Sequence, residues 1–202
     1  MISYRYSSDW IYQLESQNHW QMYWYQLELI QNNITTKDHI VEIGVGTRLI
    51  YNYLKNRNFQ ISSIDIDPVK RPDYVENIVN IDVLPEDCNT ILAFNIFEHI
   101  PYEDFRMLIN KFNSWNVNKV FIGLPYNRKI LFSIHLQVGR FLNKIFHISI
   151  RKRKILTQNH HWELDFKHYT KKRIITDFNN ADYLCDSFFK YRNNAYFYFK
   201  KI

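Results

Sequence analysis

Short apolar runs alternate with polar and helical stretches along the chain, a spacing typical of an α/β protein. Residues 39–43 predict a buried strand, residues 47–54 carry apolar side chains at helical spacing, and residues 60–65 return as a second strand. The pattern predicts one doubly wound, mostly parallel sheet of seven strands. The other five strands are expected at 78–81, 90–94, 119–124, 183–191 and 195–200.

Glycines and acids mark the ends of the first two predicted strands. The first run ends at Glu42 and turns through Gly44 and Gly46, where the missing Cβ lets a ligand approach the backbone. The second run ends at Asp65, about 20 residues further on, where dinucleotide-type folds hold a ribose diol. Asp67 is the alternative candidate. Because the carboxyl ends of parallel strands share one edge, these residues predict a crevice for a nucleoside-type cofactor.

An N-terminal helical element is expected at residues 1–35, within a single domain of residues 1–202. Ser8 can cap this helix, whose apolar stripe favours packing on the sheet edge. Contact with a substrate is the alternative. The stripe contains Trp10, Leu14, Trp20, Tyr23, Leu27 and Ile30, and the possible substrate contacts are Tyr4, Tyr6, His19 and Trp20.

The two cysteines and the N-terminus bear on location. Cys88 and Cys185 lie far apart without metal-type spacing, which favours buried thiols in a reducing compartment. The first residues are polar and aromatic and do not resemble a signal peptide. We therefore expect a cytoplasmic protein.

Positive charge is concentrated in an insertion after the fifth predicted strand, at residues 126–161. No Asp or Glu occurs between residues 105 and 162. A connection of this length is typical of a lid or binding element. Residues 128–154 interleave apolar and basic side chains, which predicts a cover over the active site or a contact with an anionic membrane surface or nucleic acid. Charges interrupt the stretch too often for a transmembrane segment, and residues 151–154 are expected at the tip of a hairpin.

A Glu98-His99 pair follows the fourth predicted strand, in the segment Phe94-Asn95-Ile96-Phe97-Glu98-His99. With the preceding strand-end residues, this order resembles class I S-adenosylmethionine-dependent methyltransferases, particularly the broad small-molecule group with a Glu-His pair at this position. The resemblance covers residues 36–200 and implies a Rossmann-like fold. Two positions depart from the family pattern: Arg48 replaces the usual third glycine, and Asn89 replaces the acid that opens the fourth strand.

The resemblance implies S-adenosyl-L-methionine as the cofactor and assigns its contacts. Glu42, Gly44 and Gly46 would surround the methionine moiety, and Asn95 would lie near the sulfonium. The adenosine contacts would be Asp65 for the ribose hydroxyls, Ile66 for the adenine face, and Asp82 with Val83 for the adenine amine.

Methyl transfer to an oxygen atom with a high pKa needs a base or a metal ion. His99 is the first candidate for the base, with Glu98 supporting it and His161 as the second candidate, because imidazole titrates near neutrality. His160, His161 and Glu163 have spacings compatible with metal ligation, but a structural loop is favoured, and no metal site is expected. Related ubiquinone-biosynthesis enzymes hold a divalent ion through an acid at the position of Asn95, where this chain keeps an oxygen and loses a charge.

The sequence therefore predicts a methyltransferase that acts on a small, glycan-linked or lipid-linked acceptor, at oxygen, with the basic insertion attracting an anionic group. One alternative is a non-catalytic binding module of the same fold. Another is an RNA methyltransferase, although Asn95-Ile96-Phe97-Glu98 stands where amine-methylating nucleic-acid enzymes have an Asn/Asp-Pro-Pro-Tyr signature.

Overall fold

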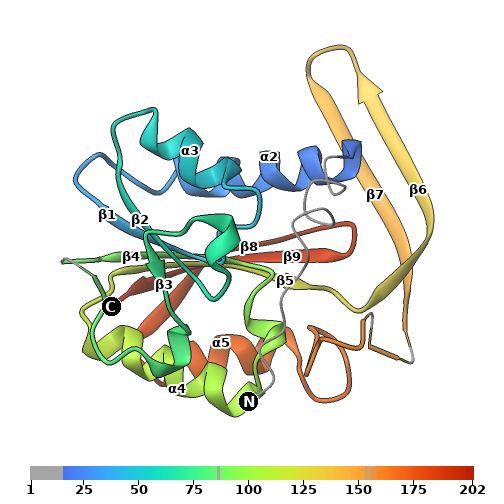
Figure 1. Cartoon of the computed structure of the whole chain (residues 1–202). Coiled ribbons are helices and arrows are strands. Elements are labelled where there is room, and N and C mark those ends of the chain that lie inside the picture. Colours follow the sequence, from blue (N-terminus) through green and yellow to red (C-terminus); the bar gives the residue numbers. More distant parts are fainter. Residues whose placement is uncertain (1–15, 86, 153, 156) are drawn as a thin grey trace.

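The chain forms a three-layer α/β/α structure in the computed structural model, which describes residues 16–85, 87–152, 154–155 and 157–202 (Figure 1). Its central sheet has the strand order β3-β2-β1-β4-β5-β9-β8. The strands are β1 (His39–Ile43), β2 (Gln60–Asp65), β3 (Tyr74–Val75), β4 (Thr90–Phe94), β5 (Lys119–Pro125), β8 (Tyr183–Tyr191) and β9 (Asn194–Lys201).

The predicted seven-stranded, mostly parallel sheet is confirmed. Strands β3, β2, β1, β4 and β5 run parallel, whereas β9 pairs antiparallel with both β5 and β8. The strand predicted at 78–81 is wrong, because Ile78–Asn80 forms the 3-10 helix η2. The side chain of Asn77 accepts a hydrogen bond from the main-chain N–H of Val79 at 3.1 Å, and such a local bond competes with strand pairing.

Two helices cover each face of the sheet (Figure 1). Helices α2 (Gln17–Gln31) and α3 (Leu49–Lys55) lie on one face, and α4 (Tyr102–Ser114) and α5 (Lys171–Asn179) lie on the other. Alternating side chains of β5 show this division. Phe121 packs in the core under α2 and α3, whereas Val120 and Ile122 pack in the core under α4 and α5. The core therefore fixes which strand ends share an edge.

Helix α2 packs on the sheet through a face that matches the predicted stripe only in part. Ile30 is buried and Tyr23 and Leu27 pack against the core, whereas 52% of Trp20 is exposed. Gln26 and Leu29 are buried as well. The hydroxyl groups of Tyr23 and Thr47 are 3.0 Å apart, so α2 borders the glycine turn after β1. The predicted cap Ser8, the stripe residues Trp10 and Leu14, and the possible contacts Tyr4 and Tyr6 lie outside the described residues.

The basic insertion forms a long antiparallel hairpin of β6 (Arg128–Val138) and β7 (Leu142–Arg151), which is a separate sheet (Figure 1). The turn lies at Gly139 and Arg140, so the prediction that residues 151–154 form the tip is wrong. Arg151 instead lies at the base, where its side chain bonds Asp165 at 2.7 Å. Among the described helices, none has the length and apolar character that a bilayer-spanning helix needs.

Candidate functional site

The candidate site lies where the strand order reverses, between the carboxyl ends of β1 and β4, the usual ligand position in open α/β sheets. Gly44 and Gly46 turn the chain away from β1 with φ angles of 77° and 49°. A Cβ on Gly44 would collide with Cδ1 of Ile96, whereas a Cβ on Gly46 would meet no atom within 4 Å. The first glycine therefore permits close packing, and the second leaves open space beside the turn.

Glu42 is a buried carboxyl group at the end of β1. Among the described residues, its Oε2 atom has no hydrogen-bond partner, and 5% of the residue is exposed. Burial raises the pKa of Glu42 to about 8, although the nearby Arg48 guanidinium and the main-chain N–H of Tyr51 act against this shift. An unpartnered buried oxygen costs free energy, so this group is suited to a cationic or hydrogen-donating ligand.

Asp65 ends β2 as predicted, but its carboxylate is already bonded within the protein. The main-chain N–H groups of Val45 and Asp67 donate to it at 3.1 and 2.9 Å. The Lys70 Nζ atom lies 3.1 and 3.2 Å from its two oxygens. A ribose diol can bond Asp65 only by replacing Lys70, because these four contacts use the acceptor sites of the carboxylate.

Arg48 stands where the resembled family has a third glycine, and its backbone adopts the conformation that glycine favours. Its φ angle is 62°, a left-handed value that costs a non-glycine residue about 1–2 kcal/mol. Its guanidinium lies 4.2 Å from the centroid of the Tyr51 ring and donates to the main-chain oxygens of Lys70 and Arg71. These contacts hold the loop after β2, which includes the half-buried Ile66.

Asn95 lies directly after β4 and has a φ angle of 56°, which asparagine tolerates better than most residues. Its main-chain N–H donates to the carbonyl oxygen of Gly123 at 2.9 Å. Its side-chain oxygen is buried and has no hydrogen-bond partner in the part of the chain that the structure describes. Asn95 thus adds a second unpartnered acceptor at the ends of the two central strands.

The structure does not bring Asp82 and Val83 to this edge. Of Val83, 77% is exposed, and the side chain of Asp82 is 96% exposed. The main-chain oxygen of Asp82 accepts from Nε1 of Trp115 at 2.6 Å, directly after the last turn of α4. The last turn of α4 precedes β5 and therefore lies at the amino edge of the sheet. The strand predicted at 78–81 would have directed Asp82 to the carboxyl edge, but η2 replaces it.

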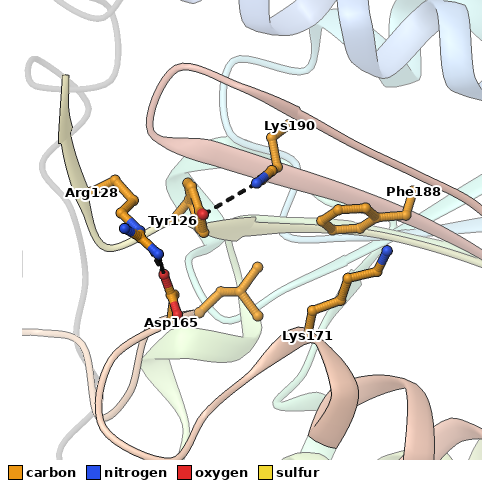
Figure 2. Close-up of a pocket in the computed structure, with 7 residues that line it drawn as sticks. Tyr126, Arg128, Asp165, Lys171, Phe188 and Lys190 are labelled. Carbon is orange, nitrogen blue, oxygen red and sulfur yellow. Dashed lines mark hydrogen bonds and ion pairs between the residues drawn. The ribbon is translucent and has the colours of Figure 1, made fainter. Parts of the chain in front are cut away.

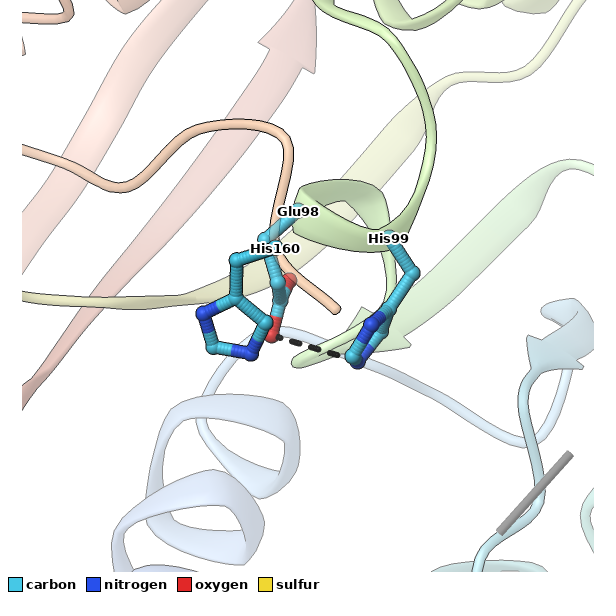
Figure 3. A group of neighbouring side chains, drawn as sticks. All are labelled: Glu98, His99 and His160. Atoms are coloured by element: carbon cyan, nitrogen blue, oxygen red, sulfur yellow. Dashed lines mark ion pairs between the residues drawn. The ribbon is translucent and has the colours of Figure 1, made fainter. Parts of the chain in front are cut away.

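Glu98, His99 and His160 form a cluster beside the segment that follows β4 (Figure 3). One ligand atom from each lies within 4.8 Å of the others. The first two come from the 3-10 helix η3 (Phe97–His99), and His160 comes from the loop that follows the hairpin. Burial raises the pKa of Glu98 to about 8 and lowers that of His99 to about 4.

Hydrogen bonds around this cluster fix the histidine tautomers. Nδ1 of His99 is 3.1 Å from the main-chain oxygen of Asn159, and Nδ1 of His160 is 2.7 Å from Oε1 of Glu163. Because these oxygens accept, each Nδ1 carries the hydrogen and each Nε2 carries the lone pair. Nε2 of His99 lies 3.9 Å from Oε1 of Glu98, and Oε2 of Glu98 has no hydrogen-bond partner among the described residues. Each histidine therefore offers a lone pair on Nε2, beside the Glu98 carboxyl group.

His161, the second predicted base, is not part of this cluster. Its side chain is exposed, while its main-chain N–H donates to the carbonyl oxygen of Glu98 at 2.8 Å. The sequence offered His160 and Glu163, together with His161, only as possible metal ligands and favoured a structural loop. Their spacing of three residues was a signal, but the fully buried Glu163 is held by the distant Asn127, which donates to its Oε2 atom.

A hollow of about 130 Å³ lies beside the hydrogen bond between Asn127 and Glu163, on the far side of β5 from β1 (Figure 2). It contains no predicted cofactor residue. Nε of Arg128 donates to Asp165 at 2.6 Å, and Nζ of Lys190 donates to the Tyr126 hydroxyl at 3.2 Å. Among the described residues, Lys171 and Lys190 make no ion pair. The hollow is thus suited to an anionic group; its lining residues are Tyr126, Arg128, Leu164, Asp165, Lys171, Phe188 and Lys190.

Comparisons with known proteins identify the fold. No protein-family model matches the sequence, and no curated protein matches it. The solved structure of the small RNA methyltransferase HEN1 aligns with a TM-score of 0.61 and 12% identity over 100% of this chain, which spans only 27% of that protein. The glycopeptide N-methyltransferase MtfA, complexed with S-adenosyl-L-homocysteine, aligns with a TM-score of 0.56 and 8% identity over 88% of this chain and 89% of its own.

A third similar structure is magnesium protoporphyrin IX methyltransferase ChlM from Synechocystis PCC 6803, with bound S-adenosylmethionine. It aligns with a TM-score of 0.58 and 8% identity over 91% of this chain and 80% of its own. The chain therefore has the fold of S-adenosylmethionine-dependent methyltransferases.

The buried Glu42 generates a prediction on stability. Because its pKa rises from 4.5 to about 8 on folding, the folded state binds a proton that the unfolded chain releases. Between these values the wild type should lose up to about 1.4 kcal/mol of unfolding free energy per pH unit relative to Glu42→Gln. Urea unfolding from pH 5 to 8 measures this slope. The exposed Glu28→Gln is the control, and equal slopes for the wild type and Glu42→Gln would contradict the assignment.

Proposed function

We propose that this protein is an S-adenosylmethionine-dependent methyltransferase. The observation that carries the proposal is the unpartnered, buried Oε2 atom of Glu42 beside the open turn at Gly46, in a fold whose solved relatives hold this cofactor or its product. The cationic amine of a bound methionine moiety would give this oxygen its missing partner.

The other cofactor contacts follow from the same edge. The ribose hydroxyls would replace Lys70 on Asp65, and adenine would pack against Ile66. The unpartnered oxygen of Asn95 would face the sulfonium end. Bound S-adenosylmethionine supplies the activated methyl group. The protein then has to orient the acceptor in line and exclude water.

The acceptor atom in this proposal is an oxygen beside His99. Nε2 of the neutral His99 ring carries a lone pair and can receive the acceptor hydroxyl proton, with Glu98 next to it. A pKa of about 4 makes this imidazole a weak base at neutral pH, where general bases work best with pKa values near 7. Removal of the proton therefore needs help from another group.

A divalent cation held by Glu98, His99 and His160 is the second role that we propose for the cluster. The donor set of one carboxylate and two imidazoles fits a transition-metal ion. The bonds from His99 to Asn159 and from His160 to Glu163 are the supporting contacts that metal-ligating histidines use. Such an ion would supply positive charge that lowers the pKa of an acceptor hydroxyl.

We further propose a small, glycan-linked or lipid-linked acceptor with an anionic group. The support is the basic hollow at Arg128, Lys171 and Lys190, which adjoins the Asn127–Glu163 contact of the site. A non-catalytic binding module would use the same cofactor residues without the cluster. RNA is the other acceptor class, for which HEN1 is the example among the solved structures.

Calorimetric titration with S-adenosylhomocysteine tests the cofactor proposal. Asp65→Ala should weaken binding by about 1–3 kcal/mol, because the ribose hydroxyls lose their buried acceptor. Asp67→Ala is the matched control, since Asp67 is equally buried but bonds the main-chain N–H of Val69. Absence of heat at saturating ligand, or an equal loss in Asp67→Ala, would reject the assignment.

A titration with Mn²⁺ followed by electron paramagnetic resonance tests the cation role. His160→Ala should weaken Mn²⁺ binding at least about ten-fold because it removes a ligand, whereas His161→Ala should leave it unchanged. The two histidines are adjacent, so the pair separates ligation from a general effect of the loop. An effect of His161→Ala equal to that of His160→Ala, or no Mn²⁺ binding by the wild type, would leave the cluster with the proton-accepting role alone.

A further inference from the structure

The hairpin of β6 and β7 carries an exposed apolar face. Residues paired across an antiparallel ladder lie on the same side of it, and Phe132 pairs with Ile148 while Ile134 pairs with Phe146. Between 46% and 67% of each side chain of this face is exposed. The apolar face consists of Phe132, Ile134, Leu136, Val138, Phe146, Ile148 and Ile150.

The opposite face of the hairpin is mostly polar, although Ile130 pairs with Ser149 there, and it is the face that meets the domain. Ser133 pairs with His147, and the Ser133 hydroxyl lies 2.8 Å from Nδ1 of His147. The ring of the half-buried His147 lies 6.2 Å from the ring of Tyr191 at the end of β8. A hairpin that packed on the domain would turn its apolar face inward, whereas this hairpin turns its apolar face to the solvent. Large exposed apolar patches mark interaction sites.

Cations lie at both ends of the apolar face. Lys129 pairs with Ile150 at the base of the hairpin, and Arg140 lies in the turn at the other end, next to Phe141, of which 87% is exposed. Among the described residues, neither cation makes an ion pair. The sequence from 105 to 162 contains no acid, so no negative charge within the hairpin opposes an anionic partner.

We propose that the apolar face of the hairpin docks on the surface of an anionic lipid bilayer. Its aliphatic and aromatic side chains would enter the boundary between headgroups and acyl chains, while Lys129 and Arg140 would bind lipid phosphates. A second copy of the chain fits less well, because pairing the two faces would bring like charges together. Nucleic acid fits less well too, since the face would desolvate phosphates without bonding them.

Docking would bring the acceptor side of the site to the bilayer. The hairpin leaves the domain just after the carboxyl end of β5, and the chain returns from it through the loop that carries His160 (Figure 1). A lipid-linked acceptor would then be presented where the cluster lies. This inference goes beyond the proposed methyl transfer, because lipid binding requires neither cofactor nor acceptor.

Vesicle flotation of the full chain tests the proposal, with phosphatidylcholine vesicles prepared with and without phosphatidylglycerol. The wild type should float only with the anionic vesicles and should dissociate at high salt. The triple variant Phe132→Ser, Ile134→Ser and Phe146→Ser should lose at least about ten-fold in lipid partitioning. The matched control replaces exposed apolar residues elsewhere: Trp24→Ser, Met107→Ser and Leu184→Ser, which should bind as the wild type does.

A second pair of substitutions tests the charges. Lys129→Gln and Arg140→Gln should each weaken binding to anionic vesicles about five-fold. Retained binding of S-adenosylhomocysteine shows that the variants are folded. A wild type that does not bind the cofactor would reject the methyltransferase proposal without affecting the membrane proposal. Equal flotation of the wild type and the triple variant would overturn the proposal. So would a wild-type dimer that the triple variant dissociates, because the face would then belong to a second copy of the chain.

Discussion

The close packing of Gly44 against Ile96 is the constraint on which the candidate site depends. Only a residue without a Cβ fits there, so the turn after β1 lies directly against the segment that follows β4. The same arrangement places Glu42 and Asn95 at the ends of neighbouring strands, each with a buried oxygen that no group in the described part of the chain satisfies. A buried oxygen without a hydrogen bond costs free energy, and a fold tolerates it where a bound ligand supplies the missing donor. These two oxygens therefore indicate the cofactor position more specifically than the glycines do.

The acceptor side depends on a different set of contacts. Asn127 follows β5 and bonds Glu163, and Glu163 in turn bonds His160 and sets its tautomer. Since Asn127 directly precedes the hairpin, the base of the hairpin and the cluster share one buried network. The basic hollow lies on the far side of β5 from the nucleoside-type crevice, whereas the cluster follows β4, next to that crevice.

The sequence predicted the strand ends that carry the crevice, because alternation and glycine position are local properties. It failed at residues 78–81, where the side chain of Asn77 bonds the backbone and supports a 3-10 turn in a segment with a strand-like apolar pattern. It also favoured His161 over His160. In an irregular loop the direction of each side chain depends on contacts that no periodic pattern indicates. Here these are the hydrogen bond from the main-chain N–H of His161 to the carbonyl oxygen of Glu98 and the bond between the side chains of His160 and Glu163.

The hairpin shows a further limit of periodicity. Alternation indicates which residues share a face, but it does not indicate which face turns toward the domain. The structure alone reveals that the apolar face points outward and that Arg151 lies at the base, paired with Asp165. Likewise, only the structure shows that Lys70 occupies the carboxylate expected to bind ribose.

A crystal structure with S-adenosylhomocysteine bound would test the assigned cofactor site. We expect the ligand amine beside Glu42, the ribose hydroxyls on Asp65, and Lys70 displaced from that carboxylate. The ligand would cross the carboxyl ends of β1 and β4 and leave Glu98, His99 and His160 facing its sulfur. A ligand bound instead in the hollow at Arg128 and Lys171, or an Asp65–Lys70 pair unchanged beside it, would contradict the account.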